Sequence, residues 1–126
     1  MDKSAVQDWL DRYVAAWRAN EAGPIEALFT EDAVYSYRPW DGDDHTIRGR
    51  DAIVASWLEE PDEPAAWDAH YEPYAVEGER AVAVGWSRYV ATADAPERTF
   101  HNAYLLRFDP DVRCVDFREF YMEEGK

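Results

Sequence analysis

Apolar residues recur at helical spacing near the start of the chain and at alternating spacing towards its end. Between residues 4 and 20 they fall three and four positions apart, the spacing that gathers side chains on one face of a helix. Ser4 followed by Gln7 matches a capping box, which predicts that the helix begins there. Its expected apolar stripe consists of Val6, Trp9, Leu10, Tyr13, Val14 and Trp17.

The next segments predict a second helix and a first strand. The sequence EAGPIEALF, residues 21–29, restarts a short helix, with Pro24 in the first turn where its missing N–H is tolerated. Residues 33–39 alternate and stop at Pro39, so we expect a strand there.

A loop and a third helix are expected to follow this strand. Residues 40–49 are polar and rich in turn formers, which indicates a loop. Residues 50–60 return to helical spacing, with Ile53, Trp57 and Leu58 as the inward side chains. The acidic sequence EEPDEP that ends this helix is interpreted as a solvated loop.

The second half of the chain predicts a run of antiparallel strands separated by short turn sequences. The expected strands are residues 67–76, 80–93, 98–108 and 113–122. Helices on one face of such a sheet make an α+β domain. No repeat or linker interrupts the pattern, so we expect one domain over residues 1–126.

Charge and composition exclude several partners. The 126-residue chain carries a net charge of −14, which argues against binding to the phosphates of nucleic acid or to an anionic membrane. The N-terminal sequence does not resemble a signal peptide, and no apolar run reaches membrane-spanning length. A cytoplasmic protein is therefore expected.

Neither a metal site nor a cofactor is expected. Cys114 is the only cysteine, so an internal disulfide is impossible and no zinc-binding cysteine pattern exists. Asp41, Asp43, Asp44 and His45 lie close together in the sequence, but their spacing matches no EF-hand or zinc template.

The last predicted strand poses the main functional question. In VDFREFYM one face carries Val115, Phe117, Glu119 and Tyr121, because side chains alternate along a strand. A carboxylate in such a row is either exposed to water or buried for a purpose.

The order of elements and three segments resemble a known superfamily. The segments YVAAWRANEAGPIEALFTEDAVYSY, IRGRDAI and LRFDPDVRC are similar to the SnoaL-like branch of the nuclear transport factor 2-like (NTF2-like) superfamily, over residues 4–123. The resemblance implies a cone-shaped α+β barrel with three helices against a strongly curved, mainly antiparallel sheet, a pocket at its open end, and a homodimer built on the sheet. This fold hosts several kinds of enzyme and plain binding domains.

The ketosteroid isomerase branch provides a first template for the site. It uses a tyrosine on the first helix and a protonated aspartate on a late strand as oxyanion donors, with an aspartate base on the first strand. Matching the segments places Tyr13 at the tyrosine, Tyr104 at the oxyanion aspartate, and Tyr37 or Arg38 at the base. Without a carboxylate base, that mechanism is rejected.

Two other enzyme templates are also incomplete. Limonene epoxide hydrolases use an Asp-Arg-Asp set, of which this chain offers Glu119 near one carboxylate position and Arg88 without a neighbouring Asp. Scytalone dehydratases need two histidines in the pocket, and only His70 and His101 lie on predicted strands. By alternation His101 points to the outer face.

The resemblance orients Glu119 into the cone and makes it the candidate proton carrier. Burial would raise its pKa and suit it to general acid–base work near neutral pH. An ion pair with Arg88 would instead keep the carboxylate ionised and structural. Tyr13 and Tyr104 are expected to hold a developing oxyanion.

The other expected ligand contacts are mostly aromatic. For the aromatic residues the alternative is core packing, and for Arg88 and Asn102 it is a structural contact with Glu119. The expected contacts are Trp17, Tyr35, Tyr37, Trp57, Trp86, Arg88, Asn102, Phe117 and Tyr121. Such a wall suits a small cyclic or aromatic compound. The hypothesis is therefore a ligand-binding protein, with cofactor-free isomerisation, cyclisation or dehydration if chemistry follows.

Two alternatives remain open. One is a non-catalytic ligand-binding protein, and the other is a protein-interaction or dimerisation module. A homodimer through the sheet is expected on the outer face, which carries His101, Ala103, Leu105 and Phe120.

Overall fold

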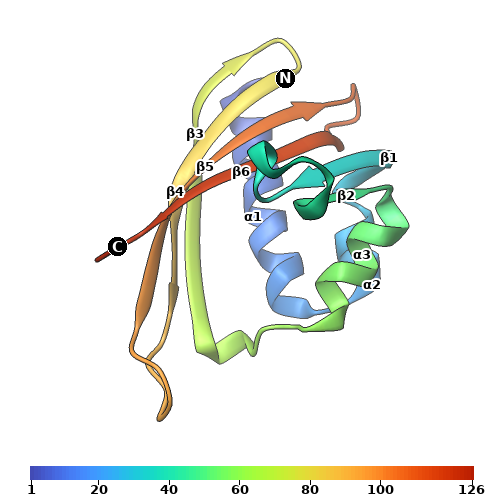
Figure 1. The fold of residues 1–126 in the computed structure, drawn as a ribbon. Helices are drawn as coiled ribbons and strands as arrows, with labels where there is room; N and C mark the ends of the chain where they lie inside the picture. The colour runs from blue at the N-terminus through green and yellow to red at the C-terminus, as the bar shows by residue number, and fades with distance from the viewer.

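The computed structural model describes residues 1–126 and shows helices packed on the inner side of one strongly curved sheet (Figure 1). Six strands follow the order β2-β1-β6-β5-β4-β3, in which β1 and β6 are parallel and all other neighbours antiparallel. The sheet stays open because its two edge strands, β2 and β3, do not pair with each other. The strands are β1 Phe29–Ser36, β2 Thr46–Arg48, β3 Trp67–Glu77, β4 Arg80–Tyr89, β5 Arg98–Phe108 and β6 Cys114–Glu123. The predicted α+β fold with a curved, mainly antiparallel sheet is confirmed.

Three α-helices cover the inner face of the sheet, as expected. They are α1 Lys3–Ala19, α2 Ala22–Glu26 and α3 Arg50–Glu59. The predicted capping box is wrong, because Asp2 caps α1 by accepting a hydrogen bond from the Ala5 N–H at 2.9 Å. Gln7 instead donates to the Tyr71 carbonyl oxygen at 2.9 Å and ties α1 to β3. None of the helices is both long and apolar enough to cross a membrane.

The segment after β1 contains more structure than its polar sequence indicates. β1 extends from Phe29 to Ser36 rather than over residues 33–39. A 3₁₀ helix, η1 Pro39–His45, follows it, and the short strand β2 then pairs with β1. A second 3₁₀ helix, η2 Pro64–Ala66, joins α3 to β3.

The core is built around Trp9 of α1, which is fully buried. Its ring packs edge-on against Phe108 at 5.3 Å and Phe29 at 6.1 Å between ring centres. Its indole N–H donates to the Leu28 carbonyl oxygen at 3.0 Å, so the polar atom of this large side chain is satisfied. These contacts fill the end of the inner sheet face where β5 turns into β6.

Candidate functional site

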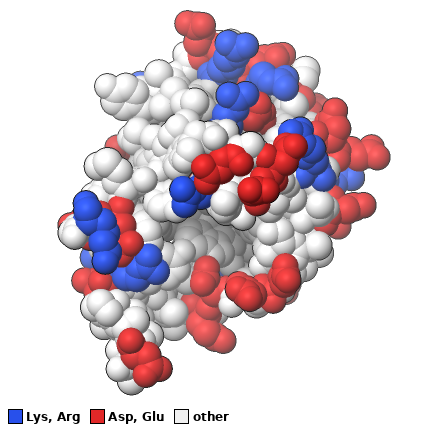
Figure 2. Space-filling view, viewed as in Figure 1, with Lys and Arg blue, Asp and Glu red and all other residues white.

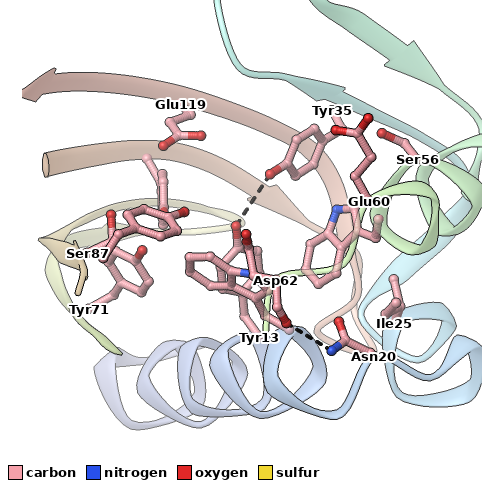
Figure 3. Close-up of a pocket in the computed structure, with 14 residues that line it drawn as sticks. Tyr13, Asn20, Ile25, Tyr35, Ser56, Glu60, Asp62, Tyr71, Ser87 and Glu119 are labelled. Carbon is pink, nitrogen blue, oxygen red and sulfur yellow. Dashed lines mark hydrogen bonds between the residues drawn. The ribbon is translucent and has the colours of Figure 1, made fainter. Parts of the chain in front are cut away.

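A cavity of about 250 Å³ lies between the helices and the inner face of the sheet (Figure 3). Figure 2 shows a hollow with an uncharged floor and acidic side chains along its lower rim. At roughly 30 Å³ per water molecule this space suits a ligand of about one ring system. It is lined by Tyr13, Trp17, Asn20, Ile25, Tyr35, Ser56, Trp57, Glu60, Asp62, Tyr71, Ser87, Tyr89, Tyr104 and Glu119.

Glu119 lies on the inner face of β6, opposite Tyr104 of β5, and is half-buried. Its Oε2 atom accepts a hydrogen bond from the Asn102 side-chain amide at 2.8 Å. The Asn102 Oδ1 atom in turn accepts from the Ser87 hydroxyl at 3.3 Å. This chain of hydrogen bonds holds the carboxyl group in place and leaves Glu119 Oε1 without a protein partner.

Burial raises the pKa of Glu119 to about 7, although the hydrogen bond from Asn102 opposes the shift. No arginine, lysine or histidine forms an ion pair with this carboxyl group. A carboxyl group with such a pKa populates both protonation states near neutral pH. It is therefore suited to take up and return a proton.

Four tyrosine side chains surround the carboxyl group from α1, β1, β3 and β5. The hydroxyl groups of Tyr13 and Tyr35 lie 3.4 Å apart (Figure 3). Burial raises the pKa of both, and also the pKa of Tyr104. Burial raises the pKa of Tyr71 to about 12, although the neighbouring Tyr104 and Ser87 hydroxyls oppose the shift. All four tyrosines thus stay protonated at neutral pH and act as hydrogen-bond donors.

Phe117 supports the tyrosines from below rather than lining the cavity. Its ring is fully buried and stacks on Tyr35 at 4.4 Å with the rings nearly parallel. It also stacks on Tyr13 at 5.5 Å. Phe117 therefore fixes the orientation of the two hydroxyl groups that face each other.

Four successive inward positions of β4 carry small residues because large rings lie above them. A Cβ atom at Gly85 would lie 2.5 Å from the Tyr71 ring and 2.0 Å from the His70 carbonyl oxygen. Glycine thus allows β3 to approach and the Tyr71 ring to lie over β4. The small residues are Ala81, Ala83, Gly85 and Ser87, and Tyr89 ends the inner row.

Arg88 does not pair with Glu119, which answers the question that the sequence left open. Arg88 lies on the outer face of β4, 3.7 Å from Glu97, with its guanidinium 5.3 Å from the centre of the Trp86 ring. Trp86 lies on the same outer face, so neither side chain reaches the cavity. The alternation along β4 was recognised, but the row with the larger apolar residues faces outward.

Tyr37 and Tyr121 also lie outside the main cavity. β1 ends at Ser36, and Tyr37 packs against His45 of η1 at 5.1 Å between ring centres. Tyr121 is 40% exposed and lines a shallower cavity that adjoins Asn102 and Glu119. The remaining predicted contacts, Trp17, Tyr35 and Trp57, line the main cavity with Tyr13, Tyr104 and Glu119, while Asn102 reaches it through Glu119.

The segment between α3 and β3 forms part of the mouth, which the sequence did not indicate. The Trp17 indole N–H donates to Asp62 Oδ2 at 3.0 Å, and the Asn20 side-chain amide donates to the Asp62 carbonyl oxygen at 3.1 Å. Glu60 lies on the same rim. The acidic composition of the segment is equally typical of a solvated loop, so no local pattern reveals these contacts.

Five further cavity residues, Ile25, Ser56, Tyr71, Ser87 and Tyr89, were not predicted as ligand contacts. Ser87 continues a row of small inward residues, and its partner Asn102 lies on the neighbouring strand. Ser87 and Asn102 are polar residues at inward positions and so indicate a polar site. Only the strand register shows that they meet each other. No group of three or more His, Cys, Asp and Glu side chains converges as a metal site would.

The same architecture occurs in several solved structures. An NTF2-like protein of unknown function from Burkholderia xenovorans aligns with a TM-score of 0.70 and 16% identity, covering 98% of this chain and 87% of the other. A candidate isomerase from Bacillus subtilis aligns at 0.72 and 15%, covering 97% and 90%. An LEH-like epoxide hydrolase from M. tuberculosis aligns at 0.68 and 11%, covering 95% and 84%. At these identities the alignments show a shared fold.

Sequence comparison gives the same assignment. No curated protein matches the chain. The SnoaL-like domain family matches residues 10–117, which is most of the chain, from the second half of α1 to the first residues of β6. Glu119 lies two residues beyond the end of this match. The chain therefore belongs to the SnoaL-like domain family, and it shares its fold with NTF2-like structures.

Proposed function

We propose that the cavity binds a small cyclic or aromatic organic compound and that Glu119 moves a proton on it without a cofactor. The observation that carries the proposal is the Glu119 carboxyl group, which has a pKa of about 7 and no basic partner. It shares the cavity with tyrosine hydroxyls that remain donors at neutral pH. Acid–base chemistry needs both a proton carrier and a group that stabilises developing charge.

The geometry suits enolisation as the first step. The Glu119 carboxylate removes a proton from a carbon next to a carbonyl group. The electrons of the C–H bond form a double bond to the carbonyl carbon, and the π electrons of the carbonyl group move to its oxygen. Hydroxyl groups of Tyr13 and Tyr104 donate hydrogen bonds to that oxygen. In a ketone with a double bond between its β and γ carbons, Glu119 then returns the proton to the γ carbon, the double bond shifts to the α and β carbons and the carbonyl group re-forms, which completes an isomerisation. Dehydrations and cyclisations use the same first step.

The relatives support a pocket-based activity without defining it. The solved structures of similar fold include an LEH-like epoxide hydrolase and a candidate isomerase. This chain does not supply an Asp-Arg-Asp set in the cavity, since Arg88 lies on the outer face. Proton transfer by one carboxyl group is therefore favoured over epoxide opening.

The test is deuterium exchange at the carbon next to the carbonyl in a panel of cyclic ketones, followed by NMR in D₂O. We expect the protein to accelerate exchange for at least one ketone and Glu119→Gln to slow it by about a hundredfold or more. The matched control is Glu124→Gln, which removes an exposed carboxyl group from the same strand end. Exchange that Glu119→Gln leaves unchanged would contradict the role of Glu119. Binding without exchange in the wild type would favour the non-catalytic alternative.

We also propose that a second copy of the chain covers the outer sheet face. Leu105 and Phe120 are each 40% exposed on this face, and Met122 is 74% exposed. The face is nearly balanced in charge although the chain carries −14, so two copies can approach there. Its charged side chains are Arg80, Arg88, Arg107 and Arg118 with Asp68, Glu72, Glu77 and Asp116.

Light scattering after size exclusion tests this dimer. We expect twice the 14.6 kDa chain mass for the wild type and a monomer for the double variant Leu105→Glu, Phe120→Glu. Val90→Glu is the control, because Val90 is 48% exposed and follows the end of β4. A monomeric wild type at micromolar concentration would contradict the proposal.

A further inference from the structure

We propose that the ligand of this cavity carries a positive charge, as a protonated amine on a ring, with the charged group held at the mouth by Glu60 and Asp62. The inference rests on the proposed function, because it names the chemical class that the same cavity selects. It follows from the acidic residues that line the cavity and from the absence of basic residues among them.

The charged residues that line the cavity are all acidic. None of the fourteen lining residues is a lysine, arginine or histidine, whereas Glu60, Asp62 and Glu119 are carboxylic acids. The acidic rim is visible below the hollow in Figure 2. Among the lining residues an anionic ligand would meet only like charges, while a cation would be attracted to them.

Two arginines on elements that border the cavity, Arg18 of α1 and Arg98 of β5, are already engaged. Arg18 donates to Asp68 at 3.2 Å and to the Pro64 carbonyl oxygen at 2.7 Å, and its guanidinium lies 4.3 Å from the centre of the Trp67 ring. Arg98, beside the adjoining shallow cavity, donates two hydrogen bonds of 2.9 Å to Glu123. Neither arginine is free to neutralise an anionic ligand.

The rim carboxylates retain capacity for a cation. Asp62 Oδ2 accepts from the Trp17 indole N–H, and Asp62 Oδ1 has no protein partner. Glu60 is exposed and makes no hydrogen bond or ion pair through its side chain. Two carboxylate groups on one rim thus remain available to an ammonium group.

Aromatic walls next to these carboxylates complete the site. Trp17 and Trp57 line the cavity with Asp62 and Glu60, and Trp57 meets Tyr13 edge-on at 5.2 Å. The faces of indole rings attract cations, and this attraction is stronger where water is partly excluded. A cavity that combines aromatic rings with acidic groups is therefore selective for an organic cation over its neutral and anionic counterparts.

Three probes of matched shape test the charge preference at neutral pH. They are tyramine, which is cationic, 4-propylphenol, which is neutral, and 4-hydroxyphenylacetate, which is anionic. Binding is followed by calorimetry and by tryptophan fluorescence. We expect tyramine to bind about tenfold more tightly than 4-propylphenol, and the anion to bind more weakly than both. The preference should shrink in about 1 M salt, which screens the rim charges.

A double variant tests whether the two rim carboxylates cause the preference for a cation. Glu60→Gln with Asp62→Asn should remove most of the advantage of tyramine and leave the affinity of 4-propylphenol unchanged. Glu59→Gln with Glu63→Gln removes the same charge from two exposed neighbours outside the lining and should leave both affinities as in the wild type.

The outcomes separate this inference from the proposed function. Equal binding of all three probes, or a tyramine advantage that survives the rim variant, would overturn the charge preference while small-molecule binding stands. Binding of none of the probes would contradict the preference and the proposed small-molecule function together.

Discussion

The two ends of the inner sheet face differ in what they bury. At one end Leu106 and Phe108 of β5 pack against Trp9, and no polar side chain joins them. At the other end the same strand presents Asn102, next to Ser87 and Glu119. The strands and their alternation are continuous, so the change from apolar to polar occurs along a single row of side chains.

This difference shows which end of the sheet stabilises the fold and which end is available for chemistry. Buried apolar area contributes stability at the packed end. At the open end a half-buried carboxyl group and several hydroxyls cost free energy unless each finds a partner. Substitutions at the packed end should therefore lower the stability of the fold, whereas substitutions at the open end should impair proton transfer.

The largest expected effect is the loss of Trp9 at the packed end. Trp9→Ala removes a fully buried ring and its hydrogen bond to the Leu28 carbonyl oxygen, and should lower the free energy of unfolding by about 3–5 kcal/mol. Urea unfolding followed by circular dichroism measures the change. A loss below about 1 kcal/mol would contradict the description of this end as the core.

A second large effect is expected at the boundary between the two ends. Gly85→Ala places a Cβ atom 2.0 Å from the His70 carbonyl oxygen, so the backbone of β3 or β4 must shift. We expect a loss of about 3 kcal/mol in the free energy of unfolding, and a displaced Tyr71 ring. Ala83→Gly, two residues away on the same row, is the control for a change of the same size in the other direction. An unaffected Gly85→Ala protein would show that β3 and β4 are farther apart than described.

Glu119→Gln should have the opposite effect, a pH-dependent gain in stability. The pKa of Glu119 rises from an ordinary value of 4.5 to about 7 on folding, so the folded state binds the extra proton between these pH values. Stability of the wild type therefore falls as pH rises through that window and levels off above it. We expect the variant to be about 1–3 kcal/mol more stable near pH 8 and equal to the wild type near pH 4.

Denaturant unfolding of both proteins across this pH range is the measurement. A difference that stays flat with pH would mean that folding does not perturb the Glu119 carboxyl group.

The sequence predicted the architecture well because its periodicity is local. Helices α1 and α3 and strands β3 to β6 were placed within a few residues of their ends. The three-residue strand β2 was missed, since Thr46–Arg48 is too short to show alternation and follows an acidic turn segment.

The site was predicted only in part because it depends on which face of each strand points inward and on how neighbouring strands are aligned. Alternation along β4 separates two rows but does not say which row faces inward. The outer row contains Trp86 and Val84, whereas the inner row has small residues because the Tyr71 and Tyr104 rings occupy the space above it. The larger side chains beside Arg88 thus led to the wrong prediction that Arg88 lies on the inner face of β4.

A smaller effect is expected from loss of the hydrogen bond between Asn102 and Glu119 at the open end of the sheet. The amide of Asn102 donates to Glu119 and holds its pKa below the value that burial alone would give. Asn102→Ala should therefore raise the pKa of Glu119 further, while His101→Ala, on the opposite face of β5, should leave it unchanged. A lower pKa in Asn102→Ala would mean that Asn102 does not stabilise the ionised carboxylate.

The most direct test of the central claim is the pKa of Glu119 itself. Carboxyl carbons of glutamate, labelled with ¹³C and assigned by comparison with Glu119→Gln, are titrated by NMR. The structure predicts that the Glu119 signal titrates at about 7. If this signal titrates near the ordinary value of 4.5, burial in the cavity does not raise the pKa of Glu119, and the proposed proton carrier is contradicted.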